Sequence, residues 1–312
     1  KLATCLSQLY HEYKRGVKAG YAKFEKFPVW NLPLKHPINI AYEAATIDLS
    51  DVNMIDPYHA ENYGVLAVNY NRDVEVFPLL KAIFEKIYGK SPYNSPTDMG
   101  VNMVGFAIKN EERASRASEE EIIRRYYQTK KNNFFGKYDD ECVDKIEMLM
   151  NQLNITTNNR KCVNAANKKA MQCGVPCMAL ELTNGKIITA KSSANFSSSA
   201  ALLLNAIKVL GKIDDSIPLI SPNVIGPIQE VKRKSLCNTS VKMHAEEVLI
   251  ALAIQATTNS LSEYALKQVN KLKGAQAHSS VIISKADFNT LRKLGIDVSE
   301  ESIPNAKKLF IR

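Results

Sequence analysis

The spacing of apolar residues changes from a helical to a strand-like period at about Thr156. Before this point, DECVDKIEMLMNQL places apolar side chains at helical spacing. After it, CMALELTNGKIITA consists of two β runs joined by Asn184 and Gly185, a dipeptide typical of tight hairpins. Helical and strand-like segments then alternate, with IPLI and AHSSVIIS as the further strands. This alternation predicts an α/β fold with a sheet covered by helices on both faces.

The chain divides by pattern into three parts. Residues 1–68 combine one amphipathic helix with a loop-rich stretch whose four prolines recur too often for long regular elements. Residues 69–155 form a small helical subdomain, and residues 156–312 form a C-terminal α/β domain. The order of elements in this last part, hairpin, helix, strand and helix, is similar to the core of the cytidine-deaminase-like fold.

The net charge of +9 favours anionic partners but does not identify them. The basic residues are spread along the chain without aromatic residues between them, which makes nucleic acid an unlikely partner and an anionic small molecule the preferred one. Six cysteines in 312 residues are too few for a disulfide scaffold. Together with the lack of a long apolar run, this predicts a cytoplasmic protein with free thiols and no membrane partner. A homo-oligomer is left open.

His244, Ala245 and Glu246 form the first half of the signature of zinc deaminases, in which the histidine binds zinc and the glutamate moves protons. The cysteine pair of that signature is absent, because no cysteine follows Cys237. One histidine supplies only one of the three protein ligands that a catalytic zinc needs. We therefore expect no metal and no zinc, and we interpret His244 as part of the first turn of a helix.

A hydroxyl-rich loop precedes an apolar helix that ends at Gly211. Free backbone N–H groups at a helix start bind phosphate or carboxylate, and hydroxyl groups and a lysine would add to this. The alternative is that serine is simply a good N-cap residue. As ligand-binding candidates this loop supplies Lys191, Ser192, Ser197, Ser198 and Ser199.

Two further segments are expected to face the same crevice. Ser221 follows the predicted strand IPLI, and the carboxyl ends of parallel strands lie at one edge of a sheet. His278 and Ser279 belong to the predicted strand AHSSVIIS, although a histidine at a strand start is often a structural residue. We include all three as ligand-binding candidates.

The densest polar group of the first half lies in NMIDPYHAENYGVLAVNYNRD. Loops held by a scaffold are where catalytic groups concentrate, although Asp and Asn are also common in turns. The catalytic candidates are Asp56, His59, Arg72 and Asp73. The ligand-binding candidates are Asn71 and, from the glycine-containing segment SPTDMGVNMVG, Asp98 and Asn102.

Several long segments resemble the uncharacterised family called domain of unknown function 1846, whose members also carry the name UPF0371. They include LATCLSQLYHEYKRG, NMIDPYHAENYG, GKSPYNSPTDMGVNM and AHSSVIIS, and the resemblance covers essentially all 312 residues. Members of the family have a glycine-rich loop like a P-loop just ahead of the position of Lys1. The resemblance implies that the chain is a fragment without the N-terminal domain, that residues 1–68 are its remnant, and that Lys1 is a ligand-binding lysine. Leu2 departs from the P-loop pattern, which has Ser or Thr there.

These observations lead to a functional hypothesis. The chain is expected to belong to an enzyme that acts on a phosphorylated or nucleotide-like small molecule, with a nucleotide as the candidate cofactor. The alternative is a non-catalytic protein that binds or senses nucleotides through the same loops.

Overall fold

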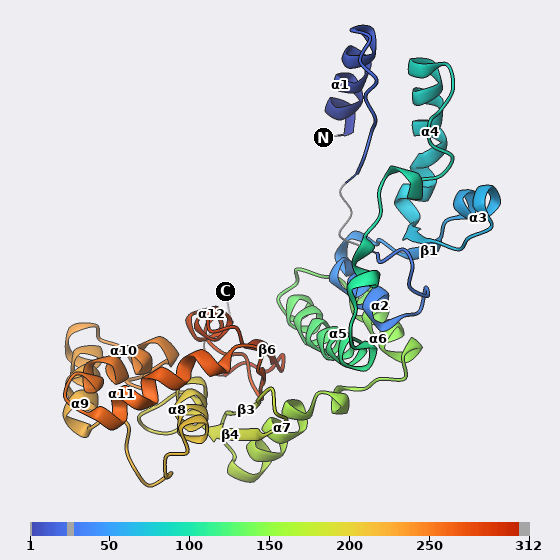
Figure 1. Ribbon diagram of the computed structural model, residues 1–312. Helices are drawn as coiled ribbons and strands as arrows, with labels where there is room; N and C mark the ends of the chain where they lie inside the picture. The colour runs from blue at the N-terminus through green and yellow to red at the C-terminus, as the bar shows by residue number, and fades with distance from the viewer. Residues whose placement is uncertain (1, 24–27, 306–312) are drawn as a thin grey trace. The chain divides into compact units, whose positions relative to one another are not determined.

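The computed structural model describes residues 2–23 and 28–305 (Figure 1). The chain forms two compact units. The N-terminal unit comprises Lys1–Arg125 and Asp139–Ile155, and the C-terminal unit comprises Tyr126–Tyr138 and Thr156–Arg312. Within the described residues, no helix combines the length and the apolar character that crossing a bilayer requires. The prediction of three parts, with boundaries at residues 68 and 155, stays a prediction.

The N-terminal unit is built mainly from helices. Its helices are α1 (Leu2–Lys14), α2 (Pro37–Ala45), α3 (Pro57–Tyr63), α4 (Asn71–Tyr88), the first part of α5 (Glu111–Phe134) and α6 (Asp140–Gln152). Its strands are β1 (Asn53–Ile55) and β2 (Val68–Tyr70), which pair antiparallel. Short 3-10 helices span η1 (Ile47–Leu49), η2 (Thr97–Met99) and η3 (Met103–Ala107).

Prolines start two of these helices. Pro37 and Pro57 occupy the first helical positions of α2 and α3. A backbone N–H at this position has no acceptor within the helix, so proline, which lacks the N–H, costs no hydrogen bond there. The side chain of Asp56 caps α3 by accepting a hydrogen bond from His59 N at 3.0 Å. The proline-rich stretch therefore contains short regular elements, as the frequent prolines predicted. The pairing of β1 with β2 was not expected.

The core of the N-terminal unit lies along α4. Phe77 and Phe84 are fully buried and pack with Leu9 of α1 and Met99 of η2. The helix ends where Gly89 adopts a positive φ of 82°, a conformation that glycine takes without steric cost.

The C-terminal unit alternates helices and strands. Its helices are α7 (Lys161–Cys173), α8 (Ser198–Gly211), α9 (Pro222–Glu230), α10 (Ala245–Ala256), α11 (Ser260–Lys267) and α12 (Lys285–Lys293). Its strands are β3 (Cys177–Glu181), β4 (Ile187–Lys191), β5 (Gln276–Ser279) and β6 (Asp297–Glu300). Shorter helical segments span η4 (Thr157–Asn159), the π-helical η5 (Val231–Ser235) and η6 (Gln268–Leu272).

The four strands form one mixed sheet in the order β4-β3-β5-β6. β3 pairs antiparallel with β4 and β5, whereas β5 and β6 are parallel. The predicted hairpin at Asn184 and Gly185 is confirmed, with Gly185 at a positive φ of 81°. The chain is therefore a mixed α/β protein, and β6 is a strand that the sequence pattern did not indicate.

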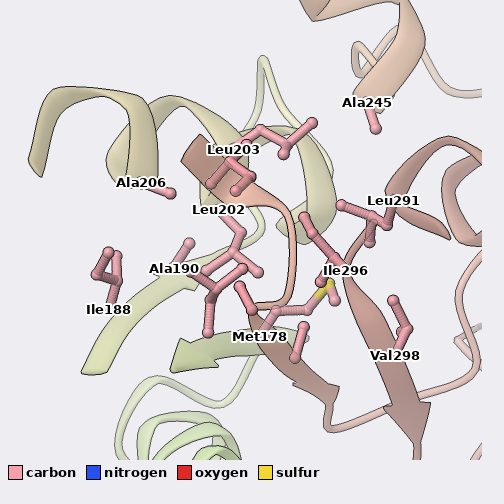
Figure 2. Packing of buried hydrophobic residues seen from close by; sticks show 14 of the residues in the cluster. Met178, Ile188, Ala190, Leu202, Leu203, Ala206, Ala245, Leu291, Ile296 and Val298 are labelled. Atoms are coloured by element: carbon pink, nitrogen blue, oxygen red, sulfur yellow. The ribbon is translucent and has the colours of Figure 1, made fainter. Parts of the chain in front are cut away.

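Helices cover both faces of this sheet. Successive side chains of a strand point to opposite faces, so residues of one strand pack against different helices. Met178 and Leu180 of β3 pack with Leu202 and Leu203 of α8 in the main core, which Figure 2 shows in part. Ala179, between them, packs instead against α7. Every residue of β3 is buried, as expected for the central strand of a three-layer arrangement.

The predicted strand IPLI is not formed. Leu219 and Ile220 are buried in an apolar cluster with residues of α8 and α10, but they do not pair with the sheet. Pro218 lacks a backbone donor, so this segment is a poor strand inside a sheet. The apolar run therefore fills a core position between helices.

Candidate functional site

The starts of α8 and α10 are joined by backbone hydrogen bonds. Ser197 N donates to Met243 O at 2.9 Å, and Met243 N donates to Asn195 O at 2.8 Å. These bonds make a short parallel bridge between Phe196 and Met243, immediately before each helix begins. The two helix N-termini are therefore held side by side.

His244 is the N-cap residue of α10 and forms a pair with Asp287. Its Nδ1 lies 2.8 Å from Asp287 Oδ2, and Ala245 N donates to Asp287 Oδ1 at 2.7 Å. The Asp287 side chain is buried, whereas that of His244 is 40% exposed. The hydrogen bond to Asp287 raises the pKa of His244 above its ordinary value, more than partial burial lowers it. The prediction that His244 starts a helix is confirmed.

Asp287 also belongs to the first turn of α12. Its backbone N donates to the Ser284 side chain, the N-cap of that helix, at 3.1 Å. The N-termini of α8, α10 and α12 thus converge, α8 and α10 through backbone bonds and α10 and α12 through Asp287. Three helix dipoles then direct their positive ends toward one region, an arrangement that favours an anion.

Two lysines border this region. Lys242 Nζ donates to Ser192 Oγ at 2.8 Å, which ties the serine loop to the start of α10. Lys232 is buried and pairs with Glu247 at 2.7 Å, and Glu247 also accepts from His244 N at 2.7 Å. Glu247 is paired with Lys232, and Asp287 is paired with His244, whereas Lys242 contacts the neutral side chain of Ser192, so its positive charge is available to attract an anion.

The structure brings only some of the predicted serines to this region. Ser197 caps α8 by accepting from Ala200 N at 3.2 Å, and Ser192 contacts Lys242. Ser198 and Ser199 are buried, and Ser199 Oγ points into the core, 3.2 Å from Met178 Sδ. Lys191 is exposed at the end of β4.

Ser221 and His278 do not lie with the serine loop. Ser221 N donates to Gln255 at 3.0 Å, at the opposite end of α10 from His244. His278 pairs in register with Ala179, whose side chain faces α7, and its own ring packs on Tyr127 at 4.7 Å. The sheet therefore separates His278 from α8, and the expected common crevice of these segments is not formed.

Ser279 and His278 have different environments. His278 is fully buried with Nδ1 2.9 Å from Ser299 Oγ, and burial lowers its pKa. Ser279 pairs in register with Met178 and its Oγ accepts from Val281 N at 3.4 Å. Both residues hold the end of β5 in place.

In the N-terminal unit, Asp56, His59 and Asp98 lie close together. Asp56 is fully buried and accepts from Thr97 Oγ1 at 2.6 Å, in addition to capping α3. His59 Nδ1 lies 3.1 Å from Ser95 Oγ and 3.8 Å from Asp98 Oδ1.

Hydrogen bonds extend this group toward Asp73. Asn69 donates to Thr97 Oγ1 at 3.4 Å, and Lys23 Nζ reaches both Asn69 Oδ1 at 3.4 Å and Asp73 Oδ2 at 2.7 Å. Asp73 is therefore connected to Asp56 through Lys23, Asn69 and Thr97.

Asn71, Arg72 and Asn102 have other partners. Asn71 Oδ1 accepts from Val52 N at 3.1 Å, and the Arg72 guanidinium pairs with Asp51 at 3.1 Å. Asn102 caps η3 by accepting from Val104 N at 2.9 Å.

Two family models match this chain, one over each half. The model described as domain of unknown function DUF1846, N-terminal, matches residues 1–154, and the corresponding C-terminal model matches residues 158–310. The chain belongs to the DUF1846 family.

The relatives of this DUF1846 protein include the UPF0371 protein SpyM3_1021 of Streptococcus pyogenes serotype M3 and the UPF0371 protein stu1377 of Streptococcus thermophilus. Each is 54% identical over 310 residues, which is 99% of this chain and 63% of the relative. The chain thus spans less than two thirds of the length of these relatives.

One expectation about the DUF1846 chain is wrong. The chain was expected to lack the N-terminal domain of the family, but the N-terminal family model matches residues 1–154. The predicted ligand lysine, Lys1, lies outside the described residues.

The sequence pattern missed Asp287 and Lys242 and treated His244 only as a zinc candidate or a helix start. Asp287 follows Ser284 by three residues, a spacing that indicates a helix start and gives no sign of a contact with His244, 43 residues away. Among the described residues of this DUF1846 protein, no three His, Cys, Asp or Glu side chains are placed to hold a metal ion. The described residues therefore do not fit a zinc site, which needs three protein ligands.

Proposed function

We propose that the C-terminal unit binds a phosphorylated or nucleotide-like small molecule at the converging N-termini of α8, α10 and α12. The observation that carries the proposal is the placement of His244. Its side chain is half-exposed, Asp287 holds its Nδ1 from the buried side, and three helix N-termini meet around it. Lys242, placed by its contact with Ser192, adds a positive charge.

His244 is the group in this site that can exchange a proton. An imidazole held by a buried carboxylate through one nitrogen keeps its second nitrogen for a ligand, which is the usual arrangement of a general acid or base. The bond to Asp287 raises the pKa of His244, which makes the imidazole a stronger base and also increases its protonated fraction, so His244 is suited to take up a proton and to return it to a leaving oxygen. The proposed activity is therefore that of an enzyme whose substrate carries a phosphate or a similar anionic group.

The finer fold assignment belongs to the same proposal. The order α7, β3, β4, α8, β5, α12 and β6, with α9 to α11 inserted before β5 and with β3 antiparallel to the other three strands, supports a cytidine-deaminase-like arrangement. In this interpretation the ligand binds at the N-termini of α8, α10 and α12.

Binding is tested by thermal shift with inorganic phosphate, nucleotides and sugar phosphates. A ligand at 100 times its Kd should stabilise the intact protein by about 2.7 kcal/mol. We expect the shift to shrink in Lys242→Met and His244→Gln and to persist in Lys186→Met, a control lysine in the exposed hairpin turn. The proposal fails if no phosphate compound stabilises the protein, or if all three variants respond alike.

A non-catalytic nucleotide-binding or sensing protein is the second candidate. It is favoured by the engagement of both neighbouring carboxylates, because Asp287 and Glu247 already accept hydrogen bonds and leave His244 as a single titratable group. Ligands that bind should be assayed for turnover with the intact protein and with His244→Gln. Turnover that is lost in the variant supports the enzyme, and binding without turnover supports the sensor.

A further inference from the structure

A row of aromatic rings crosses the N-terminal unit. The ring centroids of Tyr63 and His59 are 4.7 Å apart, those of His59 and Trp30 are 6.1 Å apart, and those of Trp30 and Phe106 are 6.3 Å apart. Phe106 is 67% exposed and Tyr63 is 47% exposed, so both ends of the row reach the surface. We call these four residues the ring row.

The Tyr63 end of the ring row is held in a fixed orientation. Tyr63 OH donates to Asp98 Oδ2 at 2.9 Å and accepts from Asn94 Nδ2 at 3.2 Å. Its ring also contacts His59, which the Asp56 cap places on α3. An exposed ring that is already fixed loses little conformational entropy when a ligand stacks on it.

Asp98 presents an unused acceptor beside this ring. Its Oδ2 accepts from Tyr63 OH, Asn94 N at 2.8 Å and Ser95 N at 3.0 Å. Its Oδ1 has His59 Nδ1 at 3.8 Å, beyond hydrogen-bond distance, and accepts no hydrogen bond from the described part of the chain. Because the Asp98 side chain is 19% exposed, this oxygen can accept a bond from a ligand.

An exposed ring with a carboxylate oxygen at its edge matches a particular chemistry. A planar heteroaromatic ring stacks on an exposed tyrosine, and an amino group on that ring donates to a carboxylate. We propose that the Tyr63 end of the ring row binds the amino-bearing base of a nucleoside, with the base stacked on Tyr63 and its amino group bonded to Asp98 Oδ1. This inference does not rest on the site proposed in the C-terminal unit.

The chain contains a built-in reporter for this site. Trp30 is its only tryptophan, and its ring is next to His59 in the ring row. Its fluorescence, and the single indole N–H signal in an NMR spectrum, can be followed during titration with adenosine. Inosine, which lacks the amino group, and ribose, which lacks the base, serve as matched probes.

The expected result is a saturable change of Trp30 emission with adenosine. Loss of a hydrogen bond to a charged acceptor should weaken binding of inosine about tenfold or more, and ribose should give no change. Tyr63→Leu should weaken adenosine binding about tenfold or more, since stacking on an aromatic ring is lost. Tyr63→Phe keeps the ring and should retain most of the affinity.

The control variant is Tyr264→Leu, because Tyr264 of α11 has the same exposed fraction, 47%. It should bind adenosine like the unaltered protein. The proposal is overturned if adenosine gives no saturable change at millimolar concentration, if inosine or ribose binds as well as adenosine, or if Tyr63→Leu binds like Tyr264→Leu. Because phosphate is absent from every probe, this outcome is independent of the test at His244.

Discussion

His244 of α10 and Asp287 of α12 form a 2.8 Å hydrogen bond across 43 residues of sequence. This bond connects the starts of two helices, and the backbone bonds of Met243 connect the same region to α8. A single long-range contact therefore orients the half-exposed histidine on which the proposed chemistry depends. The pair also makes the stability of the fold depend on pH.

Replacing His244 by glutamine should destabilise the protein more in acid than in alkaline solution. The pKa of His244 is raised in the folded protein by its bond to Asp287. Protonated His244 therefore stabilises the fold fully below the ordinary pKa of histidine, and this contribution is lost as the pH rises through the raised value. The measurement is the difference in Tm between the unaltered protein and His244→Gln over a pH series.

Asp287→Asn is the control for this prediction. Without the carboxylate the pKa of His244 should fall. The difference in Tm between Asp287→Asn and the double variant Asp287→Asn with His244→Gln should therefore depend little on pH. A difference in Tm that grows toward alkaline pH would contradict the assignment.

Leu203→Ala should destabilise the C-terminal unit by about 3 kcal/mol, because it opens a cavity in a closely packed core. Leu203 is fully buried in the same apolar cluster as Met178 and Leu202, all three of which Figure 2 labels. Ile250→Ala is the matched control, since Ile250 of α10 is 55% exposed and its truncation should cost less than about 0.5 kcal/mol. Urea unfolding of both variants checks the prediction, and equal losses would show that the core is placed wrongly.

Local chemistry determined which parts of the fold could be predicted. The β3–β4 hairpin follows from Asn184 and Gly185, because glycine reaches the positive φ that the turn requires. The end of α4 follows in the same way from Gly89, whereas at the end of α8 the left-handed residue is Lys212, one position after Gly211. These signals depend only on neighbouring residues.

Contacts between distant residues could not be predicted in this way. Leu219 and Ile220 look like a strand because they are apolar, yet the core cluster between helices buries them without sheet pairing. The partnership of His244 with Asp287 has no local signature at all. The same is true of the ring row, whose members come from three separate segments of the N-terminal unit.

Arg160→Met should destabilise the protein by about 3 kcal/mol, because it leaves buried carbonyl groups without a charged donor. The side chain of Arg160 is 1% exposed, and its guanidinium donates to Asp297 O at 2.7 Å and Ala277 O at 3.3 Å. It thereby joins the parallel strands β5 and β6. Arg160→Lys should lose less, since lysine keeps a charged donor, although it lacks the second guanidinium nitrogen that donates to Gln276. Urea unfolding that places Arg160→Met within about 0.5 kcal/mol of the unaltered protein, on the scale of a surface change, would contradict this role.

Alkylation at neutral pH should modify Cys5 and Cys237 well before Cys177. Both of the first two are exposed, whereas Cys177 is buried at the start of β3. Burial, together with the nearby Cys173, raises the pKa of Cys177 to about 11, so almost no reactive thiolate is present. Mass spectrometry of peptides after brief exposure to iodoacetamide measures the order of labelling, and the denatured protein, in which all six cysteines should react, is the control. Labelling of Cys177 in the folded protein at the rate of Cys237 would mean that β3 opens readily to solvent, which the burial of all its residues argues against.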